Sequence, residues 1–132
     1  MLHNKKIYGF LAGLTMLLFM GCYKVTTLRI DNQQEITTPV SFNADIIPIF
    51  AKSCTATGCH NSGGQVPDLT AANAFDALFA EDMIDVDKPE DSELYLWLTG
   101  QLKPAMPLGA ASNPSNINQL TLAWIKQGAK NN

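Results

Sequence analysis

The strongest constraint on this chain is a short stretch that begins at Cys54 and ends with Cys59 and His60. It places two thiols and one imidazole so close in sequence that they must share one site. Because four residues separate the two cysteines, the pair does not fit on one helical turn, and the intervening chain must bulge outward as a small loop. Gly58 makes such a bulge sterically easy. The fold has to be arranged around this loop.

The residue types in the loop match the chemistry of covalent haem attachment. The pattern is like the C-x-x-C-H signature of such sites, lengthened here to C-x4-C-H. The thiols of Cys54 and Cys59 would add across the haem vinyl groups as thioethers, and the imidazole of His60 would reach the iron from the proximal side. A disulfide between Cys54 and Cys59, or a metal site that includes them, uses the same residues and stays open at this point.

The first 21 residues have the pattern of an export signal rather than of a folded element. Lys5 and Lys6 precede an apolar run from Ile7 to Met20 that is too short for a comfortable membrane span. The residues from Leu18 to Cys22 resemble a bacterial lipobox, in which the signal peptidase cuts before a lipidated cysteine. We therefore expect residues 1–21 to be a signal peptide and Cys22 to carry lipid, with a plain secretory signal or an uncleaved anchor as the alternatives. The protein would then be an exported, membrane-anchored lipoprotein that faces the periplasm or the cell surface.

This interpretation accounts for all three cysteines, because Cys22 carries lipid and Cys54 and Cys59 remain as a pair. An exported compartment permits either thioethers or a disulfide, so the compartment does not choose between them. Removal of residues 1–21 leaves 7 basic and 12 acidic residues, a net charge of -5. Such an acidic domain is not expected to bind nucleic acid, and a docking partner should present a basic or neutral surface.

Residues 22–40 are rich in Thr, Asn and Gln and predict a flexible tether. Four short helices, joined by loops rich in Gly and Pro, are predicted within residues 41–132. The first is capped by Ser41 or Asn43, tolerates Pro48 only in its first turn, and ends at the attachment loop. The other three begin after Thr70 or Asn73, at Ser92 and near Ser115, and the last two end at Gly100 and Gly128. We expect a small all-α domain.

In the second of these helices, Phe75, Leu78 and Phe79 are spaced to face inward. A loop with many carboxylates follows and contains Met83. No EF-hand pattern is present, so we interpret it as a solvated acidic loop. The loop after His60 offers Pro67 and Leu69 as rigid apolar edges for a flat ligand.

Met106 is the candidate for a second axial ligand of the iron. Pro104 and Pro107 restrict the backbone on both sides of it, so that its sulfur can be held at a fixed depth. Met83 lacks such bracing, and a methionine that only fills a gap in the core is the competing interpretation. After removal of the signal, His60 is the sole imidazole, which excludes a bis-histidine site within one chain. It also makes a four-ligand zinc site hard to assemble.

These features together resemble a class I, monohaem c-type cytochrome domain of the kind found in exported bacterial lipoproteins. The similarity covers about residues 41 to 130. It implies a cytochrome c-like fold whose first and last helices cross near the haem, which would bring Phe50 near Trp124. It also implies one covalent haem c, with thioethers at Cys54 and Cys59 and with His60 and Met106 as axial ligands. The longer spacer between the cysteines departs from the usual family pattern.

The expected function is one-electron transfer by a haem c protein that a lipid tethers to a membrane. With both axial positions filled, we expect no enzymatic activity and no small-molecule substrate, and the partners would be redox proteins. A haem-free structural or interaction lipoprotein with a Cys54–Cys59 disulfide is the alternative. A haem sensor or enzyme in which Met106 is a labile ligand is a third interpretation.

Overall fold

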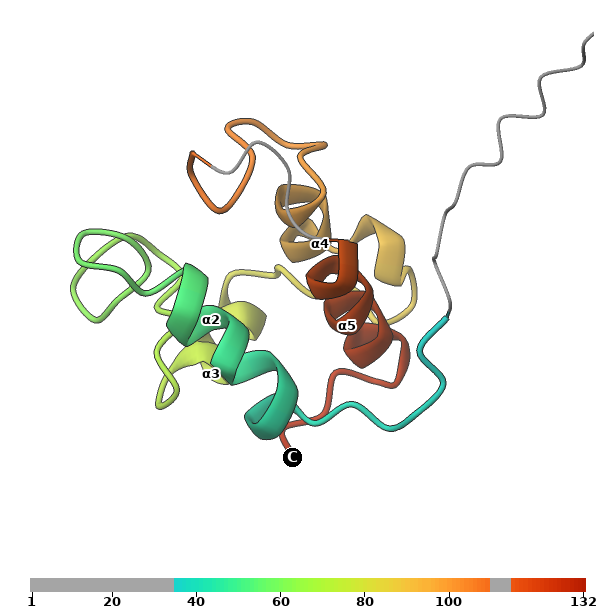
Figure 1. The fold of residues 1–132 in the computed structure, drawn as a ribbon. Coiled ribbons are helices and arrows are strands. Elements are labelled where there is room, and N and C mark those ends of the chain that lie inside the picture. Colours follow the sequence, from blue (N-terminus) through green and yellow to red (C-terminus); the bar gives the residue numbers. More distant parts are fainter. Residues whose placement is uncertain (1–34, 110–114) are drawn as a thin grey trace, which may run out of the picture. The chain divides into compact units, whose positions relative to one another are not determined.

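The described chain is a series of short helices joined by long loops (Figure 1). The structure, a computed structural model, describes residues 35–109 and 115–132. Within these ranges there is no strand, so the predicted all-α class is confirmed. The elements are a π-helical turn η1 (Phe42–Ile46), α2 (Ile47–Ser53), α3 (Ala74–Ala80), a 3-10 turn η2 (Pro89–Asp91), α4 (Glu93–Leu98) and α5 (Ser115–Lys126).

The first helical segment begins and continues as the sequence predicts. Ser41 is its N-cap, and the Ser41 hydroxyl accepts a hydrogen bond from the Ala44 N–H at 3.1 Å. Pro48 lies in the first turn of α2, where its missing N–H breaks no helical hydrogen bond. Asn132 also holds this end, because its carbonyl accepts hydrogen bonds from the Ser41 hydroxyl at 2.7 Å and from the Asn43 N–H at 2.9 Å.

Two residues predicted to cap helices hold loops instead. Ser92 precedes α4, but its hydroxyl bonds to the backbone of Asp85, accepting from the N–H at 2.9 Å and donating to the carbonyl at 3.2 Å. Asn73 precedes α3, and its amide donates to the carboxylate of Asp68 at 2.8 Å. In both cases a residue in the preceding loop, seven or five positions earlier, replaces the helix N-terminus as the partner of the polar side chain.

The core is an aromatic cluster that joins the first and last helical segments. The ring of Phe42 lies 4.9 Å from that of Trp124, 6.3 Å from that of Phe50 and 5.4 Å from that of Phe75, measured between centroids. Phe42, and not Phe50, therefore makes the ring contact with Trp124 among the described residues. The reason is that η1 adds a turn before α2, and this turn packs against α5.

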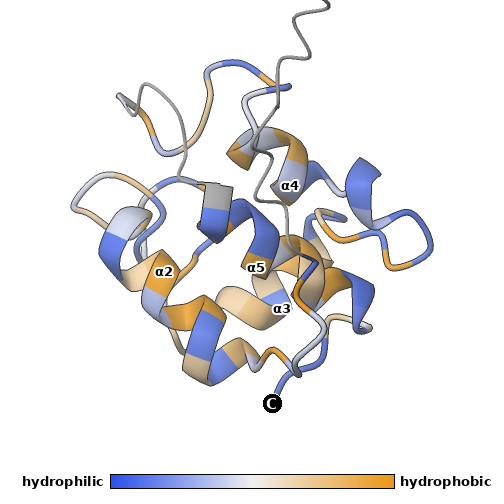
Figure 2. Ribbon diagram, turned by 45° about the vertical axis from the view of Figure 1, so that its right-hand side comes forward, coloured by the Kyte–Doolittle hydropathy of each residue, from blue (hydrophilic) through white to orange (hydrophobic). Residues whose placement is uncertain are grey.

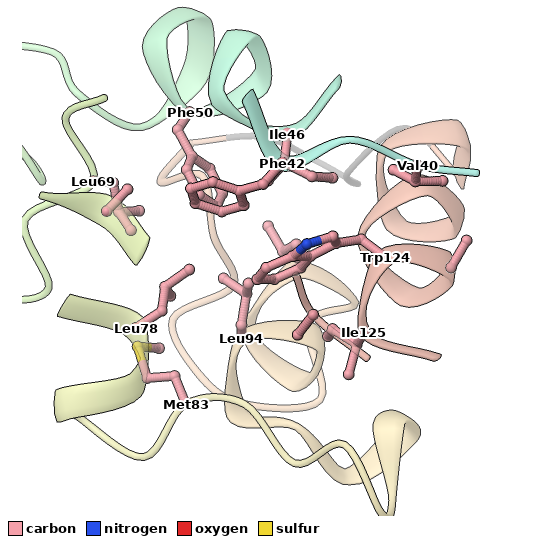
Figure 3. Close-up of a cluster of buried hydrophobic side chains, with 14 residues drawn as sticks. Val40, Phe42, Ile46, Phe50, Leu69, Leu78, Met83, Leu94, Trp124 and Ile125 are labelled. Carbon is pink, nitrogen blue, oxygen red and sulfur yellow. The ribbon is translucent and has the colours of Figure 1, made fainter. Parts of the chain in front are cut away.

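Aliphatic side chains from the other helices complete this core. Leu78 of α3 and Leu94 of α4 point toward the aromatic cluster (Figure 3). Across η1 and α2 the ribbon carries both hydrophobic and hydrophilic residues (Figure 2), and the buried ones, Phe42, Ile46 and Phe50, recur every four residues, as expected for one buried face. Each fully buried large side chain stabilises the fold by about 1.5–3 kcal/mol. The fold is thus held mainly by contacts between helices that are distant in sequence.

Packing begins before residue 41, within the segment predicted as a tether. Val40 is only 4% exposed, and Ile36 packs against the core. The amide of Gln127 joins this segment to α5, since it accepts from the Val40 N–H at 2.8 Å and donates to the Thr38 carbonyl at 2.9 Å. The predicted signal peptide, the lipidation site Cys22 and the tether up to residue 34 lie outside the described residues. Among the described helices, none has the length and apolar character needed to cross a membrane.

The end of α3 differs from the prediction. Leu78 is fully buried as expected, but Phe79 is 39% exposed. The chain reverses at Asp82, which has a positive φ of 53°, and the Met83 N–H donates to the Leu78 carbonyl at 3.0 Å. This turn carries Met83 back under the helix, where it is 8% exposed. Met83 therefore belongs to the core and not to the solvated acidic loop.

The fold makes a prediction at Thr121, whose fully buried hydroxyl has no hydrogen-bond partner among the described residues. A buried, unpaired hydroxyl destabilises a fold, so Thr121→Val should raise the free energy of unfolding by about 1 kcal/mol in denaturant titrations of the haem-free protein. Thr99→Val is the matched control. The Thr99 hydroxyl donates to the Tyr95 carbonyl at 2.9 Å, so its loss should lower stability. A loss of stability in both variants would contradict the prediction.

Candidate functional site

The loop that carries Cys54, Cys59 and His60 is closed by backbone hydrogen bonds. Cys54 is the C-cap of α2, and its N–H donates to the Phe50 carbonyl at 2.8 Å. The His60 N–H then donates to the Cys54 carbonyl at 3.0 Å, which joins the first and last residues of the loop. Gly58 has a φ of 81°, the left-handed conformation that glycine adopts without strain. The four intervening residues thus form the predicted bulge, and the two cysteines and the histidine share one loop.

Both thiols of the loop are free and half-buried. Burial, and secondarily the neighbouring Cys59, raise the pKa of the Cys54 thiol to about 11. The Cys54 sulfur is therefore a neutral thiol at neutral pH and not a reactive thiolate. A group that reacts with Cys54 has to reach it in this half-buried position.

The imidazole of His60 has a defined tautomer. Its Nδ1 lies 3.0 Å from the carbonyl oxygen of Pro67. A carbonyl oxygen only accepts hydrogen bonds, so Nδ1 carries the proton, and in the neutral ring the lone pair is on Nε2. Metal-bound histidines typically donate their second ring N–H to a carboxylate or a backbone carbonyl in this way. The lone pair on Nε2 of His60 is thus available to bind a metal ion.

The segment from Pro67 to Leu69 contacts His60 twice. Besides the contact between the ring and the Pro67 carbonyl, the Leu69 N–H donates to the His60 carbonyl at 2.8 Å. The side chains of Pro67 and Leu69 are buried, in agreement with their predicted apolar character. Sequence reasoning missed the role of the Pro67 carbonyl, because any residue supplies a backbone oxygen and no residue type marks its use.

A small pocket lies beside this segment. Its volume is about 270 Å³, and its lining consists of Val66, Pro67, Glu81, Met83, Glu93 and Trp97. The Trp97 indole N–H donates to the Glu93 carboxylate at 3.0 Å, which orients the indole in the pocket wall. Pockets for small molecules usually measure about 300–1,000 Å³, so this pocket alone does not enclose a haem group. What matches a haem group here is therefore the set of donor atoms, namely Nε2 of His60 and the thiols of Cys54 and Cys59, and not an enclosing pocket.

Met106 is connected to the same pocket through Trp97. The Met106 N–H donates to the Trp97 carbonyl at 3.1 Å, and the Met106 side chain is half-buried. Of the described residues that line the pocket, Met83 is the only methionine. Among the described residues, neither His60 nor Met106 lines this pocket, and no contact brings the two residues together. Met83 does line the pocket and is a second methionine to consider.

The larger pockets of the described chain contain none of the predicted site residues. One of about 550 Å³ lies between residues 35–37 and α5, and one of about 400 Å³ lies between residues 37–40 and the end of the chain. Over residues 35–109 and 115–132, no three His, Cys, Asp or Glu side chains form a group that could hold a metal ion. The loop at residues 54–60 and its neighbours remain the candidate site.

Comparisons of the chain with protein-family models, with curated proteins and with solved structures find no match. The interpretation of the site therefore depends on the contacts of its own residues.

The raised pKa of Cys54 predicts slow alkylation of the haem-free protein at that residue. With a pKa of about 11, the thiolate is scarce at pH 8, and its fraction should rise steadily as the pH approaches 11. Relative to a thiol with the ordinary pKa of about 8.5, iodoacetamide should modify Cys54 on the order of 100-fold more slowly at pH 8. Peptide mass spectrometry follows each cysteine separately. A rate at Cys54 that stops rising near pH 9 would contradict the prediction.

Proposed function

We propose that this chain is a haem c-binding electron-transfer protein that lipid at Cys22 tethers to a membrane. The observation that carries the proposal is the contact between His60 Nδ1 and the Pro67 carbonyl at 3.0 Å. It leaves Nε2 as the free donor atom of an oriented imidazole, directly after the second of two free thiols. A disulfide or a surface loop does not need an imidazole prepared in this way.

The thiols have the chemistry that covalent attachment requires. Each S–H would add across one vinyl C=C bond, so that sulfur bonds to one carbon and the hydrogen goes to the other. The addition needs no external oxidant, and both cysteines are in the free thiol form. A backbone hydrogen bond from the His60 N–H to the Cys54 carbonyl closes the loop, so both thiols and the imidazole belong to one closed segment.

The remaining residues would hold and shield the bound group. Pro67 and Leu69 are buried apolar residues next to His60, and Trp97 and Met83 line the pocket beside them. Met106, held by its backbone to Trp97, is the proposed second ligand. When bound, haem would supply a one-electron Fe(III)/Fe(II) couple, and a histidine–methionine ligand pair favours a comparatively high potential. Occupied axial positions favour a carrier over an enzyme.

The charge of the domain bears on its redox partners. With a net charge of -5 after removal of residues 1–21, the proposed carrier would dock on basic or neutral surfaces. Electrostatic steering of this kind acts on the association rate and weakens as salt is added.

The first test is the mass of the protein produced in a host that matures c-type cytochromes. We expect the purified chain to carry the added mass of one haem through denaturation, because thioether bonds are covalent. A chain lighter by two hydrogens would instead indicate the disulfide of the alternative interpretation. The double variant Cys54→Ala, Cys59→Ala is the control and should carry no covalent haem. A wild-type mass with two unmodified thiols from the same host would refute the proposal.

The second test distinguishes the two candidate sulfur ligands. Met106→Leu should lower the reduction potential of the haem-loaded protein on the order of 0.1 V, since the axial ligand is a main determinant of haem potential. Met83→Leu makes the same chemical change at a buried residue in the pocket wall and should shift the potential much less. The reverse result, a large shift for Met83→Leu alone, would assign the second ligand to Met83.

A further inference from the structure

Asp68 lies between the two backbone groups that bind His60. The Pro67 carbonyl accepts from the His60 ring, and the Leu69 N–H donates to the His60 carbonyl. The Pro67 carbonyl belongs to the peptide unit that joins Pro67 to Asp68. Because that unit is planar, the direction of its oxygen is fixed once the backbone on both sides is fixed. The Pro67 side is fixed by burial of its ring.

The Asp68 side is fixed by its own carboxylate, which accepts four hydrogen bonds. One carboxylate oxygen accepts from the Thr70 N–H at 2.9 Å and from the Thr70 hydroxyl at 2.6 Å. The other accepts from the Ser62 hydroxyl and from the Asn73 amide, both at 2.8 Å. Ser62 precedes Asp68 in the loop, and Thr70 and Asn73 follow it. The carboxylate thus ties together both sides of the chain between His60 and α3.

These bonds are the strong kind, because the acceptor is charged. Hydrogen bonds from Thr70 first, and also from Asn73 and Ser62, hold the pKa of the Asp68 carboxyl well below its usual range. The neighbouring stretch from Gly63 to Val66 is exposed and begins with two glycines, so its side chains contribute little to holding the loop. The carboxylate of Asp68 is therefore the main side-chain constraint on this loop outside the buried Pro67 and Leu69.

We infer that Asp68 is the positioning residue for His60: its four hydrogen bonds hold the Pro67 carbonyl at Nδ1 and so keep Nε2 free for a ligand. The consequence for the tautomer of the imidazole is independent of haem, whereas the consequence for the iron rests on the proposed function. In the loaded protein, a weaker bond from Nδ1 to the Pro67 carbonyl would make Nε2 a poorer electron donor to the iron.

The test uses the full-length, haem-free protein in detergent, with long-range ¹H–¹⁵N NMR of the histidine rings at a pH where they are uncharged. His3 is the only other histidine and is assigned with His3→Gln. In the wild type the proton should lie on Nδ1 of His60. Asp68→Asn should reduce the ratio of the Nδ1–H to the Nε2–H tautomer by about tenfold, as expected for the loss of a charge-assisted hydrogen bond.

The matched control is Asp76→Asn, which removes the same charge from an exposed position on α3 and should leave the tautomer ratio unchanged. Ser62→Ala and Thr70→Val keep the charge and each remove one hydroxyl donor to Asp68, so each should reduce the ratio by about two- to threefold. These two variants decide the question if Asp68→Asn does not fold. A wild-type ratio in folded Asp68→Asn, or in both hydroxyl variants, would overturn the inference.

The reduction potential of the haem-loaded protein is the second readout. Both Asp68→Asn and Asp76→Asn remove one negative charge. Asp68→Asn should shift the potential to more positive values than Asp76→Asn does, because it also makes His60 a weaker electron donor to the iron. Equal shifts in the two variants would contradict a role for Asp68 at the iron. If no haem-loaded protein forms, the proposed function fails, and the tautomer ratio of the haem-free protein still decides the inference.

Discussion

The arrangement of the site depends on two hydrogen bonds between His60 and the segment 67–69. One joins the ring Nδ1 to the Pro67 carbonyl at 3.0 Å, and the other joins the Leu69 N–H to the His60 carbonyl at 2.8 Å. Together they fix the position of the imidazole and the atom on which it carries its proton. Because Pro67 and Leu69 are also buried, the same segment links the loop of Cys54 and Cys59 to the core.

The helices fix the ends of the two loops that carry His60 and Met106. α2 ends at the loop that contains both cysteines, and its residue Phe50 packs against Phe42, which in turn contacts Trp124 of α5. α4 supplies Trp97, whose carbonyl binds the Met106 N–H. The loops that carry His60 and Met106 both extend beyond the helices (Figure 1). A small aromatic core thus supports two long loops, and these loops carry both cysteines, His60 and Met106.

The sequence predicted the features that local chemistry decides. Ser41 caps η1 and Pro48 lies in the first turn of α2, because both follow from the backbone of their own segment. The sequence did not predict the burial of Met83 or the exposure of Phe79, since both depend on the reversal of the chain at Asp82. The role of the Pro67 carbonyl was also missed. Periodicity and motifs describe side chains, whereas this contact uses a backbone oxygen placed by the loop.

The central claim is that His60 and the two thiols form a covalent haem site. The most direct measurement is a pyridine haemochrome spectrum of the purified protein from a cytochrome c-maturing host, recorded after extraction with acidified acetone to remove non-covalent haem. We predict the spectrum of a haem c with two thioether bonds, at one haem for each chain. A spectrum without a haemochrome band, in protein whose Cys54 and Cys59 remain unmodified, would contradict the claim.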